Sequence, residues 1–548
     1  MLTRLLIISI LFAVAGCDFI NSDVNIDPNQ PVSVSPQLLL PQIQSSSARI
    51  LAGDLNRAQH GFLGLTSYLD DFNMSNGTWN DAWEALYSGP LADVEKMIAM
   101  TGESNPHYYS IGLIYKAYFN TILVDLWGDV PVDVSAGTPD DPTPFQPGMV
   151  IYQNALADLD LAIQMLERLS PVVVTGDLIF QGKSSAWQKV ARSLKLQLLM
   201  TTRLVNSNIA ADIKAIVDDE LISVPGDDFS FVFSKAPGQN HPWFELAYSG
   251  DNQFQYIDYQ VMFEMLWDKD PRLNFYFKRQ TDDYRAVITE YFSSPMEEYY
   301  FCGPYGAGTC FKYLADNKQV IEALYGDDPT EEELKYLGGF LGRDRANPRG
   351  IPDDGDQRLL PGLYPAGGLF DTERLIFPKD NTDGDNGVFP ILTSVDVRFY
   401  LLEASLLGYI QLDDAEIFEQ AIRTHITQVV EFGGSNIEVE SPSADAIDKY
   451  VTLWMSKLNV ASSAERKLDI VAKQRWFCSW GNAYHGYNLF RRTGYPTELQ
   501  PPIQLPRQFA LRLPYPSSEL TLNPHAEAYQ QIVYDLDAVF WDTLRFQF

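Results

Sequence analysis

The sequence predicts a mainly α-helical fold in which paired helices stack against one another and a loop-rich segment interrupts them. Apolar residues recur at helical spacing over two long blocks of the chain. Between the blocks, glycine, proline, aspartate and aromatic residues crowd together, a composition typical of loops. The chain has 548 residues, enough for one large helical array with insertions or for two domains.

The first helical block covers about residues 36–225. Four apolar stripes in it repeat at the i, i+3, i+4 and i+7 positions that share one helix face. The stripes begin at Trp79, Ile111, Ile151 and Trp187. Each stripe must be buried against a neighbour, and helices paired through short polar breaks favour stacked hairpins of the tetratricopeptide kind.

The second helical block covers about residues 391–480. The loop-rich segment, about 226–390, separates the two blocks and includes one expected helix near Tyr259–Trp267. The proline-rich tail ends with a short amphipathic stretch near 526–542. The helices predicted in the second block span residues 395–407, 412–432, 444–457 and 465–480.

The amino terminus predicts export. A positive charge precedes an apolar run, Leu5–Ala15, that is too short to span a bilayer as a helix. Small residues and Cys17 follow, which resembles a bacterial lipobox: residues 1–16 form the signal peptide and Cys17 becomes the lipid-modified first residue. An ordinary signal peptide with a chance cysteine is the alternative. Residues 17–35 are rich in turn formers and predict a lipid-anchored tether to a helical domain over 36–548.

Composition restricts the partners of the chain. It contains 40 basic and 72 acidic residues, for a formal net charge of −32. A field of that sign repels nucleic acid and anionic lipid head groups, so no nucleic-acid partner is expected. Aromatic residues make up 13% of the chain, and they supply flat amphipathic surfaces for binding as well as core.

Three cysteines remain once Cys17 is assigned to the leader. Cys302 and Cys310 flank a glycine-rich loop, and in an oxidising compartment this spacing favours a disulfide. Metal binding is the alternative, although no second cysteine pair or histidine cluster stands near them in the sequence. Cys478 lies among aromatic residues and is expected to be a buried free thiol.

No known catalytic motif is recognised in the sequence, and the chain is predicted not to be an enzyme. The six histidines are scattered without metal-ligand spacing, and no nucleophile elbow or phosphate-binding glycine loop occurs. An exported glycoside hydrolase is the enzyme alternative, because it would also need aromatic subsites and two carboxylates.

Two segments combine the aromatic and small polar groups that sugar binding needs. In the first, Asn73 and Trp79 are candidate ligand contacts, although Trp79 could equally begin a buried stripe with Trp83. The second contains the candidates Tyr299, Tyr300 and Tyr305 beside the expected disulfide, which would stiffen that loop. Alternatively, these tyrosines cover a small core beneath the loop. A third, weaker candidate is the group Gln253, Phe254 and Tyr256.

An acidic, glycine-containing loop is a candidate calcium site. Asp380, Asp383 and Asp385 provide carboxylates in a turn of the kind that calcium accepts. The spacing is not that of an EF-hand and no closing glutamate follows, so a plain solvated turn is the competing interpretation. No other cofactor is expected.

Seven short strings occur in order along the chain. They are NIDPN at 25–29, DLWGDVP at 125–131 after Ala117, WQKVARSLKL at 187–196, DPRL at 270–273, KQRW at 473–476, RRTGYP at 491–496 and RLPYP at 512–516. Together they resemble the SusD/RagB family of nutrient-binding outer-membrane lipoproteins, and its SusD-like branch in the Bacteroidetes most closely. Arg192 departs from the asparagine usual in the third string.

The resemblance implies a scaffold of four tetratricopeptide-like units opposite a variable, loop-rich face. It also implies an outer-membrane location through the lipid anchor, exposed at the cell surface. The implied ligand is an oligosaccharide, or a peptide in some branches, and the implied partner is a SusC-like TonB-dependent transporter that the protein covers as a lid.

Most of the strings are expected to be structural. Gly128 and Gly494 are suited to end helices, and Arg491 and Arg492 to hold carboxylates or carbonyls. The tryptophans that open the third string and close the fifth, at 187 and 476, lie on apolar stripes and favour core positions.

Overall fold

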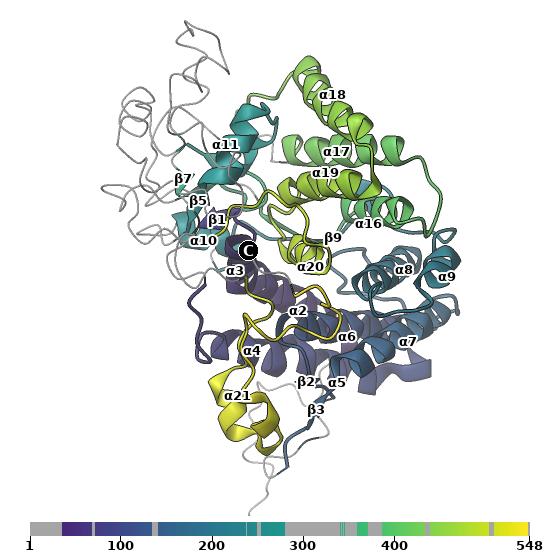
Figure 1. The fold of residues 1–548 in the computed structure, drawn as a ribbon. Helices are drawn as coiled ribbons and strands as arrows, with labels where there is room; N and C mark the ends of the chain where they lie inside the picture. Colours follow the sequence, from purple (N-terminus) through teal and green to yellow (C-terminus); the bar gives the residue numbers. More distant parts are fainter. Residues whose placement is uncertain are drawn as a thin grey trace, which may run out of the picture.

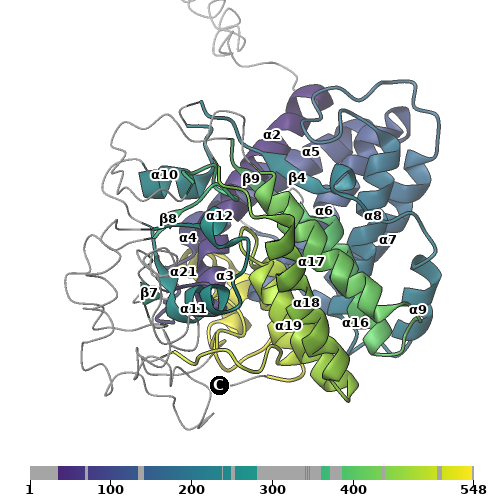
Figure 2. The same cartoon turned by 90° about the horizontal axis from the view of Figure 1, so that it is seen from above.

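Helices fill one side of the molecule, and a smaller part built from short strands and short helices lies beside them (Figures 1 and 2). The computed structural model describes residues 35–67, 72–133, 137, 141–236, 238–248, 254–279, 340, 342–343, 345, 359–370, 386–432, 439–502 and 509–545. The expected signal peptide and most of the expected tether lie outside these residues, so the domain boundaries stay predictions.

The first helical block is built around a long central helix, α6 (Pro106–Trp127), which packs against α5 and α7. Its other helices are α2 (Pro36–Ile50), η2 (Leu51–Leu55), α3 (Asn56–Phe62), α4 (Asn80–Leu86), η3 (Tyr87–Leu91), α5 (Ala92–Thr101), η4 (Gly102–Ser104), α7 (Gly148–Leu166), α8 (Ser184–Thr201) and α9 (Ile209–Ile216). The successive packing of α5 on α6, α6 on α7 and α7 on α8 confirms the predicted stacked hairpins.

The second helical block repeats this arrangement. Its helices are α16 (Ser394–Leu406), α17 (Asp414–Val430), α18 (Ala444–Val460), α19 (Ala464–Phe477) and α20 (Tyr484–Thr493). Each of α16 to α19 begins after a capping residue that accepts a backbone hydrogen bond, as Thr393 does for α16. Helix α16 also packs against α8, so the two blocks share one core.

The intervening segment contributes short strands and helices. They are η6 (Pro225–Asp227), β4 (Phe229–Val232), α10 (Pro242–Tyr248), β5 (Tyr256–Asp258), α11 (Tyr259–Trp267), α12 (Leu273–Tyr276), β6 (Phe277–Lys278), β7 (Gly342–Arg343), β8 (Leu360–Pro361) and β9 (Val388–Leu392). Strand β5 lies between β1 (Thr66–Ser67) and β7, while β6 pairs with β8. Strands β4 and β9 pair antiparallel with Phe231 opposite Phe389. The helix expected at 259–267 is present.

The tail differs from the prediction. Helix α21 (Ser517–Leu522) is followed by a short 3₁₀ helix, η9 (Pro524–Tyr529), and then by turns and irregular chain to residue 545. The amphipathic stretch expected near 526–542 is therefore helical only as far as Tyr529. The chain here packs onto a further two-stranded sheet, β2 (Val130–Pro131) with β3 (Phe145–Gln146), where Tyr529 stacks on Phe145 at 4.3 Å between ring centres.

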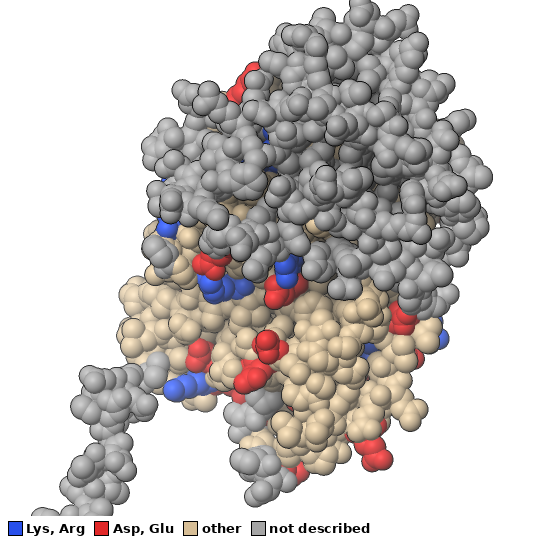
Figure 3. Space-filling view, turned by 90° about the vertical axis from the view of Figure 1, so that its left-hand side faces the viewer, with Lys and Arg blue, Asp and Glu red and all other residues tan. Residues whose placement is uncertain are grey.

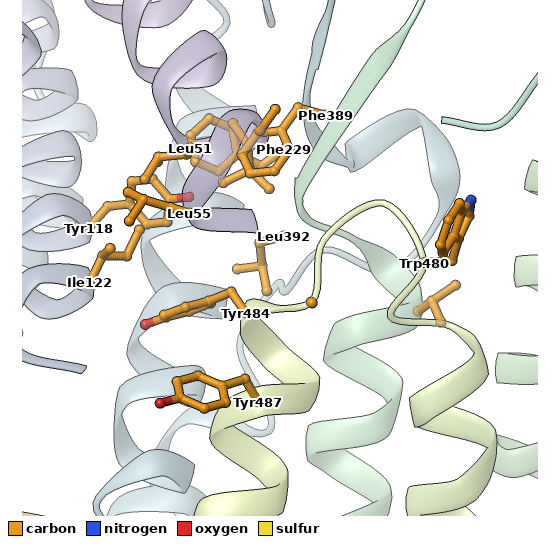
Figure 4. Close-up of a cluster of buried hydrophobic side chains, with 14 of the residues drawn as sticks. Leu51, Leu55, Tyr118, Ile122, Phe229, Phe389, Leu392, Trp480, Tyr484 and Tyr487 are labelled. Atoms are coloured by element: carbon orange, nitrogen blue, oxygen red, sulfur yellow. The ribbon is translucent and has the colours of Figure 1, made fainter. Parts of the chain in front are cut away.

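The core joins both blocks and the intervening strands. Figure 4 shows Leu51 and Leu55 of η2 near Phe229 of β4 and Tyr118 of α6. Trp187 and Trp476 are 0% and 1% exposed, so their predicted core positions are confirmed. Their indole nitrogens are satisfied inside the protein: Trp187 donates to Asp177 at 2.9 Å and Trp476 donates to the carbonyl of Leu63 at 2.8 Å.

Candidate functional site

A groove of about 520 Å³ opens between the end of α2, the turn η2, α4 and α10; we call it the α4–α10 groove. Helices α4 and α10 lie toward the left of Figure 1, and Figure 3 views the molecule from that side, where scattered charged side chains interrupt a largely uncharged described surface. The residues that line it are Arg49, Ile50, Gly53, Asp54, Leu55, Asp81, Ala82, Ala85, Pro242, Glu245 and Leu246.

The first wall is the π-helical turn η2. Gly53 leaves helical geometry there, at φ −79° and ψ −131°, and the kink joins α2 to α3. Leu51 on the same turn is buried in the core (Figure 4). Asp54 is left on the outer side of the turn, with 67% of its side chain exposed.

The second wall is α4. Trp79, Trp83 and Leu86 are buried, so the opposite side of this short helix carries Asp81 and Ala82 toward the groove. The start of α4 is held by the tail of the chain, because Asn80 donates to Ser517 Oγ at 3.0 Å.

The third wall is α10, which is anchored by one buried tryptophan. Trp243 is 0% exposed and packs edge-on against His60 and Trp480, with ring centres 4.8 and 5.1 Å away. Glu245, two residues on, faces the groove and pairs with Arg49 of α2 at 2.5 Å. Arg49 also donates to the carbonyl of Gly238 at 3.1 Å, so it braces α2 to the chain around α10.

Three carboxylates and one guanidinium line the groove. Arg49 pairs with Glu245, and Asp54 pairs with Arg57 at 2.6 Å. Asp81 is exposed, and within the described ranges it makes no hydrogen bond or ion pair. The charge left without a partner in the groove is therefore negative.

The sequence-predicted ligand residues fall into two groups. Trp79 is 6% exposed and its indole nitrogen donates to Met74 Sδ at 3.4 Å, while Asn73 is exposed on the loop before α4. Trp79 thus belongs to the buried stripe, and a ligand contact by either residue stays a prediction. Of the third candidate group, Phe254 and Tyr256 are 0% and 4% exposed.

The other predicted site residues lie outside the described residues. These are Cys17, Gln253, Tyr299, Tyr300, Tyr305, Cys302, Cys310, Asp380, Asp383 and Asp385. Their lipidation, disulfide, ligand and calcium roles stay predictions. Elsewhere in the described chain, no group of three or more His, Cys, Asp or Glu could hold a metal ion.

Sequence reasoning missed the groove carboxylates Asp54, Asp81 and Glu245. They are three among 72 acidic residues, and they come from segments up to about 190 residues apart. The sequence could have indicated only the position of Asp81. The apolar stripe of Trp79 and Trp83 predicts which side of α4 is buried, and Asp81 lies on the opposite, exposed side.

The motif residues are structural, as expected. The buried carboxylate of Asp125 accepts hydrogen bonds from Tyr152 and Tyr484 at 2.5 Å, and from the indole of Trp541 at 2.7 Å. Burial raises the pKa of Asp125 from its ordinary value. Arg491 donates to the backbone carbonyl of Asp125 at 2.8 Å, so this network joins α6, α7, α20 and the tail.

The DPRL string forms a second buried network. Arg272 and Asp270 pair at 2.5 Å with both side chains 0% exposed, and Tyr450 donates to Asp270 at 2.7 Å. Cys478 is a partly buried free thiol, which accepts from Arg272 at 3.3 Å. Burial raises the pKa of Cys478 to about 11, so this thiol is unreactive at neutral pH.

The remaining expectations for Gly494 and Arg492 are confirmed. Gly494 ends α20 in the left-handed conformation, with φ at 71°. Arg492 pairs with the carboxylate of Glu403 on α16.

No helix in the described part of the chain combines the length and apolar character needed to cross a membrane. A search of curated protein sequences found no match.

Comparison with solved structures shows the fold. A SusD/RagB family protein from Bacteroides thetaiotaomicron is 19% identical, with a TM-score of 0.67 over 93% of this chain and 99% of that one. A SusD homologue from Bacteroides fragilis is also 19% identical, with a TM-score of 0.64 over 93% and 99% of the two chains. A chitin-binding protein, again 19% identical, gives a TM-score of 0.67 over 93% and 100%.

Comparison with family models identifies the protein family to which the chain belongs. Residues 28–301 match the SusD-like family described as starch-binding and associating with the outer membrane. The match covers half of the chain and includes every wall of the α4–α10 groove. Together with the ordered motifs and the helical fold, it shows that the chain belongs to the SusD/RagB family of outer-membrane nutrient-binding proteins.

Proposed function

We propose that this protein captures nutrient oligosaccharides at the bacterial cell surface and passes them on without changing them. The observation that carries the proposal is the match of residues 28–301 to a starch-binding, outer-membrane-associating family. The chitin-binding protein of similar fold supports an oligosaccharide ligand.

Four of the described histidines are held in the core, away from the α4–α10 groove. His60, His241, His425 and His485 are all buried, and they pack against aromatic rings or bond to backbone and neighbouring side chains. Burial lowers the pKa of each, and none faces the α4–α10 groove as a general base would.

The test of capture is calorimetric titration of the mature full-length chain with starch-derived and chitin-derived oligosaccharides and with short peptides. The proposal expects saturable binding of at least one oligosaccharide series. An exported glycoside hydrolase would instead release shortened products from the same sugars, and that result would replace the proposal.

We further propose that Cys17 carries the acyl chains that hold the protein at the outer membrane. Labelled palmitate should enter the protein in cells and should be lost in a Cys17→Ser variant. Protease treatment of intact cells should degrade the protein, because the proposed site of action is the outer face.

The proposed partner is a SusC-like TonB-dependent transporter, over which the captured ligand is held. Affinity purification of the tagged, lipidated protein from outer membranes should recover such a transporter. Recovery of the protein alone under mild detergent would contradict this part of the proposal.

A further inference from the structure

We propose that the α4–α10 groove binds the positively charged side chain of a lysine or arginine in a peptide. This inference rests on the proposed capture function and names a ligand class for one groove of the same protein. It follows from the kind of surface that the walls present and from the charge left unpaired between them.

The walls are aliphatic. Ile50 and Leu246 provide the larger apolar surface, and Ala82 and Ala85 keep the α4 side shallow. Of the described residues that line the groove, none is aromatic. A sugar ring would find no flat face to stack on, whereas the methylene stem of a lysine or arginine packs well along aliphatic side chains.

The charges favour a cation. Arg49 is held by Glu245 at 2.5 Å and by the Gly238 carbonyl, so it is not directed to an anionic ligand. Asp54 already has Arg57. Asp81 is the groove carboxylate that, within the described chain, has no partner, and it lies beside Ala82 and Ala85 on α4.

A stem packed on Ala82 and Ala85 would therefore bring a terminal ammonium or guanidinium group to a free carboxylate. The volume of about 520 Å³ falls within the roughly 300–1,000 Å³ of small-ligand sites. The net charge of −32 would also attract a cationic peptide from a distance, and added salt would weaken that attraction.

The test uses two peptides that differ in one charge. The probes are acetyl-Ala-Ala-Lys-Ala-Ala-amide and the same peptide with an Nε-acetylated lysine, titrated calorimetrically into the mature full-length chain at low ionic strength. The lysine peptide should bind about two- to fivefold more tightly than its acetylated form, as expected for one exposed charge pair.

Two variants of α4 locate the effect. Asp81→Asn should weaken binding of the lysine peptide about two- to fivefold and leave the acetylated peptide unchanged. Glu84→Gln, an exposed acid on the same helix outside the groove lining, should leave both affinities unchanged. Equal thermal unfolding midpoints for the two variants would show that the fold is intact.

Every other outcome overturns the inference. Equal affinity for the two peptides, or an unchanged affinity in Asp81→Asn, removes the role of charge in this groove. If glucosamine oligomers bind through Asp81 and the lysine peptide does not, the ligand of the groove is an amino sugar and not a peptide. If oligosaccharides bind but the lysine peptide does not, the proposed function stands and the inference fails; if neither class binds, both fail.

Discussion

The guanidinium of Arg49 and the carboxylate of Glu245 form an ion pair across the α4–α10 groove, with 2.5 Å between Nη2 and Oε2. The two residues are 196 positions apart in the chain, on α2 and α10. Their side chains are 43% and 28% exposed, so the pair is in contact with water. It joins two walls of the groove and neutralises two of the four charges that line it.

Replacing Arg49 tests this arrangement. Arg49→Met should change the free energy of unfolding by less than about 1 kcal/mol, because solvent-exposed ion pairs contribute little. It should strengthen binding of the lysine peptide about two- to fivefold, because it removes the one guanidinium among the described residues that line the groove. Calorimetry and urea unfolding measure the two effects. Arg423→Met, which removes a similarly exposed guanidinium on α17, should leave peptide affinity unchanged, and weaker binding in Arg49→Met would contradict the account.

The buried pair of Arg272 and Asp270 should behave differently. Arg272→Met should lower the free energy of unfolding by about 3–5 kcal/mol, because it leaves the carboxylate of Asp270 buried without its cation. Urea unfolding followed by tryptophan fluorescence measures the loss. Lys449→Met, which breaks an exposed pair with Asp445, is the control and should cost under about 1 kcal/mol. Similar losses in the two variants would refute the structural role assigned to the DPRL string.

Gly128 ends α6 in a conformation and a space that suit glycine alone. Its φ is +96°, and an added Cβ would lie 2.0 Å from Nη2 of Arg512. Gly128→Ala should therefore destabilise the protein by more than the roughly 1–2 kcal/mol expected from backbone strain. Gly408→Ala separates the two causes, because φ there is +77° but nothing lies within 4 Å of the new Cβ. Thermal unfolding midpoints should fall further for Gly128→Ala, and the reverse order would be inconsistent with this packing.

Buried histidines should make the fold sensitive to acid. Burial lowers the pKa of His60 and of His241 to about 3, against 6.5 in the unfolded chain. The unfolded state thus binds more protons between pH 6.5 and 3, and each histidine reduces stability by about 1.4 kcal/mol per pH unit as pH falls through this window.

Carboxylates whose pKa is raised by burial, among them Asp125 and Asp228, act in the opposite direction. Burial raises the pKa of Asp228 to about 7, so the folded state favours its protonated form, and its contribution is lost as pH rises from 3.8 toward 7. Because the histidines and these carboxylates act in opposite directions, the contribution of one histidine is isolated by replacing it. Between pH 7 and pH 5, the urea midpoint of His241→Gln should fall less, or rise more, than that of the unchanged protein. An equal change in the two proteins would show that His241 does not contribute to acid sensitivity.

Much of the helical scaffold could be predicted because its residues carry a one-sided apolar pattern. The stripes at Trp187 and Trp476 correspond to buried faces of α8 and α19. Gly494 was expected to end a helix, but the extent of α20 was not predicted. Every residue from Tyr484 to Arg492 is buried, the polar ones as well as the apolar ones. Its arginines are held by partners in distant segments, which periodicity does not reveal.

The groove could not be predicted for a related reason. Asp54 faces outward only because Leu51 and Leu55 enter the core, and Glu245 does so only because Trp243 is buried. Tertiary packing decides which acidic residues face the groove. Because acidic residues are abundant along the chain, the sequence does not distinguish the three groove carboxylates from the others. Aromatic content directed the sequence prediction to tyrosine-rich loops, whereas the groove in the described residues has aliphatic walls.

The most direct test of binding without catalysis is to incubate the mature full-length protein with an oligosaccharide that it binds and then to measure the mass of that oligosaccharide. Equilibrium dialysis would measure the bound fraction, and mass spectrometry would compare bound and free sugar. The account predicts saturable retention of sugar whose mass is unchanged after prolonged incubation. Shortened sugars appearing in proportion to protein concentration would contradict it.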